Sequence, residues 1–483
     1  MFEDKEFVPG AQILGSCSCE YLQKMLSKVT WKQIDNRNPK FVLFDRVGPS
    51  DLTQGLSTNL SLLSALIALS YTPPRIERIF FNRDLKSTSE YTLQIYVKGV
   101  PTRFKLDLYF PFISSDFAFI QPSSSINTVS LWPVFLEKLW AKRSGSYFSP
   151  SKSDHVTSIL TELTGAPNEI IFSCSPNLAN KLIKSLENKF TIIAIPKTQV
   201  LNLKTVSINP LFAYTITDFQ TSSILLKNPL GFSPLPSELT TNCQDSGVLV
   251  DFSSFSDKFD YISILHYHDN FKYSYKLSNK NCFQVSIHTH GLSYFSVFQQ
   301  SGEDIPLRIV VADDQGYVKG KSSMGSSIWI EVECVPGTYY IYTEKSPSQV
   351  FSVYSQMNAG IEEIEEIGFF SNHFTVASIK NKPQVHLVQV CSGINVYCLE
   401  KLGVFEDDCM EGYIYNVVEN KLDDSFAVIE IEAEYENFEV AGKMEFIVQP
   451  GSSQLVYFKQ RILTQDTFFN SKIRAKLVPL GVS

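Results

Sequence analysis

Apolar and polar residues follow a helical period over parts of the first half of this chain. The uninterrupted apolar run Leu60–Leu69 (LSLLSALIAL) predicts a buried helix over residues 60–70. Apolar residues at helical spacing predict three further helices, over residues 131–142, 154–163 and 177–190. Helices mixed with short strands in this way are typical of an α+β domain.

Strand-like alternation occurs between these helices. Residues 91–97 and 103–108 alternate between apolar and polar side chains and predict a β-hairpin joined by the turn at residues 98–101. Three further strands are expected at residues 191–195, 213–217 and 224–226.

From about residue 258 onward only the strand period remains. Short alternating runs separated by turn residues predict an antiparallel β-sandwich over residues 258–356. The expected strands are residues 283–288, 294–299, 307–312, 327–333, 339–343 and 350–355. The acidic segment Glu362–Glu366 is expected to be a solvated linker. A second β-rich stretch follows to residue 480, with strands expected at 384–390, 425–434 and 454–458.

Composition narrows the classes of function. The net charge is −8 without a basic stripe, which argues against nucleic-acid binding. The 9 cysteines lack CxxC spacing, which indicates reduced thiols instead of a disulfide framework. The sequence begins with MFEDKEFVPG, which has no apolar region of a secretory signal. The run Leu60–Leu69 is too short to cross a bilayer, so we expect no transmembrane segment and a cytoplasmic protein.

Residues 51–69 (DLTQGLSTNLSLLSALIAL) resemble the active-site segment of the calpain family of cysteine proteases. In that family a Gln-Gly pair precedes Gly-Asp-Cys-Trp and an apolar helix. Gln54 and Gly55 match the pair, and the helix matches in length and phase. Leu60 stands at the cysteine position and Ser61 at the tryptophan position.

Further segments match calpain motifs in the order in which the family has them. Trp132–Tyr147 resembles the helix that ends in Glu-Lys-Ala-Tyr-Ala-Lys and continues into Gly-Ser-Tyr. Phe212–Thr217 (FAYTIT) resembles the His-Ala-Tyr-Ser-Val-Thr strand, with Phe212 at the histidine position. Asn228–Gly231 resembles the Asn-Pro-Trp-Gly loop, with Asn228 at the asparagine position. Shorter matches lie at residues 163–165 and 245–259.

The resemblance implies a papain-like protease core of two subdomains, followed by two C2-like antiparallel β-sandwiches. We expect the first subdomain at residues 1–135, the second at 136–257, and the sandwiches at 258–356 and 365–480. Lipid binding by such sandwiches would need clustered basic loops, which the sequence lacks.

Calpain catalysis requires a cysteine thiolate, a histidine base, an asparagine that orients the histidine and a glutamine in the oxyanion hole. By the resemblance, Asn228 and Gln54 keep the two supporting positions. Leu60 cannot attack a carbonyl carbon and Phe212 cannot transfer a proton, so we expect no cleavage by this mechanism. We expect Leu60 and Phe212 to pack together in the former cleft, and Gln54 and Asn228 to satisfy buried backbone groups.

A displaced nucleophile is an alternative interpretation of the same segment. Ser57, Thr58 and Ser61 flank Leu60, but a hydroxyl group needs a base. His155 is the histidine available in this half of the chain, and nothing in the sequence places it near Leu60. This alternative predicts residual peptidase activity and labelling by thiol or serine reagents.

Calcium is also implied by the resemblance, because calpains bind it in their protease subdomains. Asp51 matches one acidic ligand position, but the partner acid position holds Ser130. A hard cation prefers several oxygen ligands with carboxylates among them, so we expect Asp51 to cap a turn and expect no cofactor. The sequence has no EF-hand loop of the D-x-D-x-D-G type.

Two His-x-His pairs, His266/His268 and His288/His290, are candidates for a metal site. Residues i and i+2 of a strand share a face, so neighbouring strands could bring four imidazoles to one Zn²⁺. The alternative interpretation is that all four are partly exposed strand histidines.

These features favour a catalytically inactive calpain-like protein that acts as a binding or scaffold component. Inactive calpain-like proteins are common in protists, where several associate with the cytoskeleton or cilia, so the resemblance to this family implies protein partners of that kind. Two alternatives stay open: a calcium-dependent peptidase with residual activity, and a calcium- or lipid-binding module formed by the tandem sandwiches.

Overall fold

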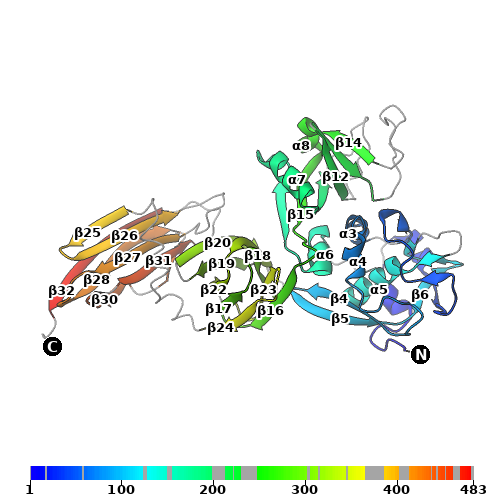
Figure 1. Cartoon of the computed structure of the whole chain (residues 1–483), viewed down its shortest axis with the longest axis horizontal. Coiled ribbons are helices and arrows are strands. Elements are labelled where there is room, and N and C mark those ends of the chain that lie inside the picture. Colours follow the sequence, from blue (N-terminus) through cyan, green and yellow to red (C-terminus); the bar gives the residue numbers. More distant parts are fainter. Residues whose placement is uncertain are drawn as a thin grey trace. The chain divides into compact units, whose positions relative to one another are not determined.

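The computed structural model divides the chain into two compact units, Met1–Asp269 and Asn270–Ser483. The structure describes residues 2–16, 19–56, 59–122, 128–148, 155–197, 213–220, 222–229, 247–301, 305–313, 316–343, 346–364, 386–401, 413–436, 438–441, 444–451, 453–460 and 468–479. Each unit has its own sheets and its own apolar core, and each is described by itself below (Figure 1).

The first half of unit 1 is built around helices α3 (Leu60–Ser70) and α5 (Trp132–Ser144). Residues 62–70 of α3 are all buried, which confirms the helix predicted from the apolar run. The hairpin β4 (Tyr91–Val97) and β5 (Val100–Leu106) is also confirmed. Its turn is shorter than expected because Lys98 and Gly99 both adopt positive φ, at 47° and 80°, which permits a two-residue connection.

Short elements complete this half of unit 1. They are α1 (Ala11–Leu14), α2 (Glu20–Leu26), α4 (Pro73–Glu77), β1 (Thr30–Gln33), β2 (Phe41–Val42), β3 (Leu52–Gln54), β6 (Tyr109–Ile113), β7 (Asp116–Phe117), β8 (Ile120–Pro122) and β9 (Val129–Ser130). The strands form small sheets: β1-β6-β7, β2-β9 and β3-β8. The β2-β9 pair is parallel, whereas β1-β6, β6-β7 and β3-β8 are antiparallel.

The second half of unit 1 is a six-stranded antiparallel sheet with the order β10-β15-β11-β12-β13-β14. Its elements are β10 (Asn168–Phe172), β11 (Thr191–Pro196), β12 (Tyr214–Gln220), β13 (Ser223–Lys227), β14 (Gly247–Asp251) and β15 (Phe259–Leu265), with helices α6 (Val156–Thr164), α7 (Leu178–Glu187) and α8 (Phe255–Lys258). Helices α7 and α8 lie beside this sheet (Figure 1). Leu182 of α7 and Phe255 of α8 share a core with Ile192 of β11.

Strand β15 corrects one expectation from the sequence. We expected residues from 258 onward to begin the first sandwich, but β15 lies between β10 and β11 in the sheet of unit 1. The alternation of β15 is that of a buried strand in any antiparallel sheet, so periodicity alone does not show to which sheet it belongs.

Unit 2 begins with two antiparallel sheets of orders β16-β23-β18-β21 and β20-β19-β22-β17-β24. The strands are β16 (Lys272–Ser278), β17 (Cys282–Ile287), β18 (Gly291–Gln299), β19 (Ile305–Asp313), β20 (Gly316–Gly325), β21 (Ser327–Cys334), β22 (Gly337–Thr343), β23 (Gln349–Ser355) and β24 (Gly360–Glu363). Both sheets contribute to one core, in which the rings of Phe283 and Phe351 stack at 4.7 Å.

Strand β24 corrects a second expectation. The acidic segment Glu362–Glu366 was expected to be a linker, but Glu362 and Glu363 pair with Gln284 and Phe283 of β17. The last residues of that segment, 365 and 366, lie outside the described residues.

The rest of unit 2 contains a five-stranded sheet, β25-β26-β27-β31-β29, and a three-stranded sheet, β30-β28-β32. The strands are β25 (His386–Cys391), β26 (Ile394–Lys401), β27 (Tyr413–Asn420), β28 (Ser425–Glu436), β29 (Phe438–Ala441), β30 (Glu445–Val448), β31 (Ser453–Gln460) and β32 (Phe468–Pro479). The two sheets share a core that includes Val396, Val418 and Ile429. None of the helices in the described part of the chain combines the length and apolar character needed to cross a lipid bilayer.

Candidate functional site

The beginning of α3 is the position that the calpain resemblance assigns to the nucleophile. The Asn59 side chain accepts a hydrogen bond from the Leu62 amide at 2.8 Å and caps the helix. Leu60 follows as the first helical residue, half-buried, and packs against the core of the six-stranded sheet. An apolar side chain therefore connects the start of α3 to the second half of unit 1.

The position assigned to the base, Phe212, lies outside the described residues. Ala213, which follows it, is buried, and its amide donates to Ser64 Oγ at 3.3 Å. Ser64 lies one helical turn after Leu60, so the chain immediately after position 212 contacts the first turns of α3. The packing expected between Leu60 and Phe212 stays a prediction.

Asn228 lies just after β13 and is half-buried. Because Lys227 pairs with Thr215 of the antiparallel neighbour β12, Asn228 lies at the same end of the sheet as Ala213. Asn228 and the contact between Ala213 and Ser64 thus lie at the same end of the sheet, and Leu60 lies one turn before Ser64 in α3. Helix α3 packs against both β11 and β12 there.

Gln54 ends β3 in the first half of unit 1, opposite Ile120 of β8. Residue Gln54 is exposed, and the role expected for it, to satisfy buried backbone groups, stays a prediction. The next residue, Gly55, is required by a close approach, because a Cβ atom there would lie 2.0 Å from the Phe119 carbonyl oxygen. The Gly55 position of the Gln-Gly pair therefore has a structural role in the joint between β3 and β8, and this role does not depend on Gln54.

The residues considered as a displaced site are not assembled around Leu60 in the described part of the chain. Ser57 and Thr58 lie outside it, and Ser61 lies in the first turn of α3. The His155 ring hydrogen-bonds to Tyr261 Oη at 2.6 Å and to Thr157 Oγ1 at 3.0 Å, at the beginning of α6.

Asp51 ends a short 3₁₀ turn and is 4% exposed. Its carboxylate accepts a hydrogen bond from the Gly48 amide at 2.9 Å, which is the turn-capping role expected for it. Burial raises the pKa of Asp51, and the Gly48 hydrogen bond and the charge of Arg46 oppose that shift. At the second acidic ligand position, Ser130 Oγ lies 3.3 Å from the Asp45 amide, which donates to it.

The two His-x-His pairs are not in strands, contrary to our expectation. His266 and His268 follow the end of β15, and His288 and His290 lie in the connection between β17 and β18. His266 is buried, and its Nε2 contacts Glu169 Oε2 at 3.1 Å. The described residues contain no group of three or more His, Cys, Asp or Glu side chains placed to hold a metal ion.

Comparison with known proteins agrees with the resemblance. Residues 2–234 match the family model of the calpain family cysteine proteases. This chain therefore carries a calpain-family protease domain over residues 2–234. Calpain-13 of Rattus norvegicus is 25% identical over 170 residues, which are 34% of this chain. The match spans 25% of the length of that calpain.

Solved structures add no further argument about this calpain-family chain. The oxalate decarboxylase of Lactobacillus farciminis aligns with a TM-score of 0.14, at 8% identity over 44% of this chain and 79% of that chain. The oxalate decarboxylase of Bacillus subtilis at pH 4.6 aligns with a TM-score of 0.12, at 10% identity over 44% of this chain and 70% of that chain. TM-scores this low do not indicate a shared fold.

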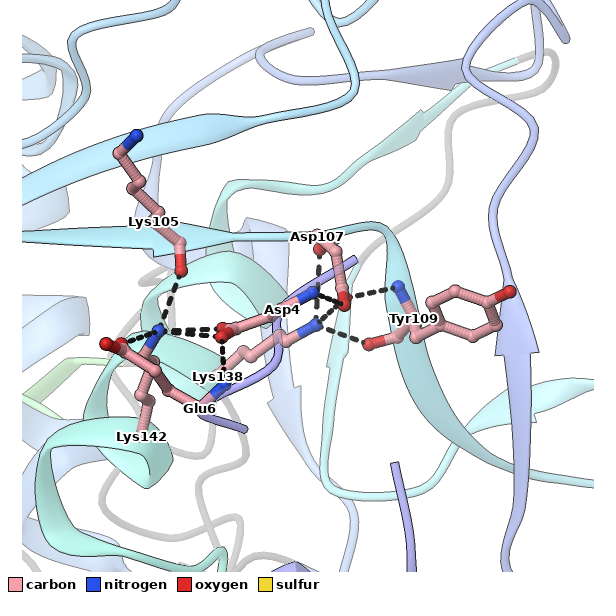
Figure 2. Close-up of polar contacts among 7 residues, drawn as sticks. All are labelled: Asp4, Glu6, Lys105, Asp107, Tyr109, Lys138 and Lys142. Carbon is pink, nitrogen blue, oxygen red and sulfur yellow. Dashed lines mark hydrogen bonds and ion pairs between the residues drawn. The ribbon is translucent and has the colours of Figure 1, made fainter. Parts of the chain in front are cut away.

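The calpain motif at residues 132–147 has a structural role that sequence reasoning missed. Glu137 of α5 is buried, and its carboxylate accepts a hydrogen bond from the Ile120 amide of β8 at 2.8 Å. Lys138 is also buried, and its ammonium group donates to Asp107 and to the Tyr109 carbonyl oxygen (Figure 2). Burial lowers the pKa of Lys138, and the neighbouring Asp107 carboxylate opposes that shift.

Residues near the beginning of the chain join the same charged cluster. The Asp4 amide donates to Asp107 Oδ2 at 2.9 Å, and Lys142 Nζ donates to both Asp4 carboxylate oxygens at 2.9 and 2.8 Å (Figure 2). Lys142 also pairs with Glu6 at 3.0 Å. The calpain-family motif, which places Glu137, Lys138 and Lys142 among apolar residues of this helix, was the indication in the sequence that buried partners exist.

Proposed function

We propose that this calpain-family chain does not cleave peptides by the calpain mechanism and acts as a binding or scaffold component. The observation that carries the proposal is Leu60. It is the first residue of α3, where the family places its thiolate, and its apolar side chain packs against the core of the neighbouring sheet. The helix dipole stabilises a negatively charged thiolate at a helix N-terminus, but the side chain of Leu60 has no ionisable group.

The proposal includes the finer layout of the molecule. The two halves of unit 1 would be the two protease subdomains, divided near residue 135. The paired sheets of unit 2 would be two C2-like β-sandwiches. This assignment is supported by the cores that each pair of sheets shares, which contain Phe295 and Phe351 in one case and Val418 and Ile429 in the other.

The proposal is tested by casein cleavage with the purified full chain, in millimolar calcium and in chelator. We expect no cleavage in either condition, because the two groups that break the peptide bond are replaced. A Leu60→Cys/Phe212→His double variant is assayed beside it, with Leu60→Ala/Phe212→Ala as the matched control without a thiol. Activity that appears only in the Cys/His variant would support a site that lost its catalytic groups but kept its geometry.

Cleavage by the native chain would overturn the proposal. Labelling with thiol- and serine-directed reagents, followed by peptide mapping, would then decide between a cysteine and the hydroxyl groups of Ser57, Thr58 and Ser61. Calcium dependence of that cleavage would favour the residual-peptidase alternative.

We further propose that the partners are proteins of the cytoskeleton or cilium. The support is the diffuse net charge of −8, which disfavours nucleic acid, together with the resemblance to the calpain family, which includes inactive members that associate with the cytoskeleton or cilia. Co-sedimentation with microtubules and with actin filaments tests this. Binding to either polymer would support the proposal, and a chain that stays in the supernatant with both would contradict it.

A further inference from the structure

Arg75 of α4 and Arg78, the residue that caps the C-terminus of this helix, both contact segments from the other half of unit 1. We propose that they form an arginine clamp that holds the two halves of unit 1 together and fixes the segment through which the chain leaves unit 1. The clamp does not depend on the absence of catalysis proposed above, and its test is independent of the casein assay.

Arg75 makes the first half of the clamp. It is 3% exposed, and it donates from Nη1 to Thr191 Oγ1 at 2.7 Å and from Nη2 to the Lys189 carbonyl oxygen at 2.6 Å. Lys189 connects α7 to β11 with a φ of 56°, a left-handed conformation that is uncommon for a residue with a side chain. Arg75 therefore binds the start of a central strand at a point where the backbone is constrained.

Tyr267 is the second residue that the clamp holds. The Arg75 guanidinium lies over the Tyr267 ring at 5.1 Å and the Arg78 guanidinium at 6.0 Å. Arg78 Nη1 also donates to Tyr267 Oη at 2.9 Å. Tyr267 is 7% exposed and lies between β15 and the end of unit 1 at Asp269, so its ring anchors the exit segment, residues 266–269.

The exit segment also has contacts with other elements of the second half of unit 1. His266 contacts Glu169 of β10 at 3.1 Å, and the Phe190 ring lies 4.9 Å from the His266 ring and 5.1 Å from the His268 ring. Burial, His266 and Arg75 together lower the pKa of His268 to about 4, so this ring is neutral near pH 7 and adds no charge beside Arg75. The exit segment thus contacts both Arg75 of α4 and Glu169 of β10.

The free energy needed to separate the two halves of unit 1 favours a single arrangement of these halves. The Arg75 guanidinium is buried, and its hydrogen bonds to Thr191 and Lys189 would break if the halves separated. A buried charged donor that loses its acceptors is costly unless water replaces them. The clamp therefore couples separation of the halves to release of Tyr267.

Hydrogen–deuterium exchange of the full chain tests the clamp with Arg75→Met. We expect amide exchange in residues 189–194 and 264–268 to increase about ten-fold, because the local opening energy falls when charged hydrogen bonds are removed. Strands β26 and β27 of unit 2 should exchange as in the native chain. Thr191→Val, which removes one acceptor and keeps the ring contact, should give a smaller increase confined to residues 189–194.

Arg103→Met is the matched control. Arg103 lies over the Phe81 ring at 4.4 Å, and both residues belong to the first half of unit 1. This variant removes an arginine–ring contact that lies within the first half of unit 1 and does not connect it to the second half. Exchange at residues 189–194 and 264–268 should therefore not change. Unchanged exchange at those residues in both Arg75→Met and Thr191→Val would overturn the proposal, as would an equal increase across the whole of unit 1.

Discussion

Lys138 shows how one buried charge organises several segments of unit 1. Its side chain is 1% exposed, as is that of its partner Asp107. Asp107 also accepts hydrogen bonds from the amides of Asp4 and Tyr109, at 2.9 and 3.0 Å. The pair is thus surrounded by hydrogen bonds that compensate for part of the lost hydration of both charges.

Replacing Lys138 with Met should lower the free energy of unfolding by about 3 kcal/mol, because it leaves the Asp107 carboxylate buried without its cation. Urea unfolding followed by tryptophan fluorescence measures the loss. Lys105→Met is the control, since Lys105 pairs with Glu90 at 2.9 Å and its side chain is 60% exposed. Such an exposed pair contributes under about 1 kcal/mol. Equal losses in the two variants would contradict the structural role of Lys138.

Single residues were predicted from the sequence as positions in a motif, without their partners. Leu60, Asn228 and Asp51 were identified because family motifs contain them in order along the chain. Arg75 was missed, since its partners Thr191 and Tyr267 are far away in the sequence and no local pattern connects them. The His-x-His pairs were interpreted as strand residues because alternation continues past the last backbone pairing of a strand.

At the scale of elements, the joint between β3 and β8 depends on the absence of a side chain. Besides the Phe119 carbonyl oxygen, the Ala118 carbonyl oxygen would lie 2.9 Å from a Cβ atom at Gly55. The Leu56 amide donates a hydrogen bond to the Ala118 carbonyl oxygen at 2.9 Å. This bond holds the backbones of residues 55–56 and 118–119 close together shortly before α3.

Gly55→Ala should therefore destabilise the protein by about 2 kcal/mol, because neither backbone can move away without breaking the pairing of β3 with β8. Thermal unfolding by circular dichroism measures the change. Gly48→Ala provides the control, because a Cβ atom at Gly48 would have no neighbour within 4 Å. A Gly55→Ala protein as stable as Gly48→Ala would show that the joint can relax.

The elements predicted best are those that bury a continuous apolar face, such as α3, α5 and the β4–β5 hairpin. The strands that were missed in the first part of unit 2 are β16, β20 and β24, and all three lie at the edges of their sheets. An edge strand packs fewer apolar side chains than a central one, so its alternation is weak. In β16 the only buried residue is Ser278.

At the scale of the whole molecule, the boundary between the units follows the sheet and not the change of periodicity. A chain that ends at residue 257 lacks β15, which separates β10 from β11. A chain that ends at residue 269 keeps all six strands and the residues of the arginine clamp.

We therefore expect residues 1–269 to fold alone and residues 1–257 to remain unfolded or to aggregate, because the loss of an interior strand leaves β10 without a partner and opens one edge of β11. Expression of both fragments, with circular dichroism and amide NMR dispersion as readouts, makes the comparison. A fragment 1–263, which divides β15, should behave like the shorter one. A well-folded 1–257 fragment would show that β15 is dispensable.

The central place of β15 also constrains the order of events during protein synthesis. Asn168 of β10 pairs with Leu265, and Thr191 of β11 pairs with the same residue from the other side. Strand β11 can pair with β12 early, but β10 has no partner until the last segment of unit 1 has left the ribosome, so the sheet is incomplete until then. Until that moment the apolar edges of β10 and β11 are open to other chains, and molecular chaperones are expected to be most needed in this interval of translation.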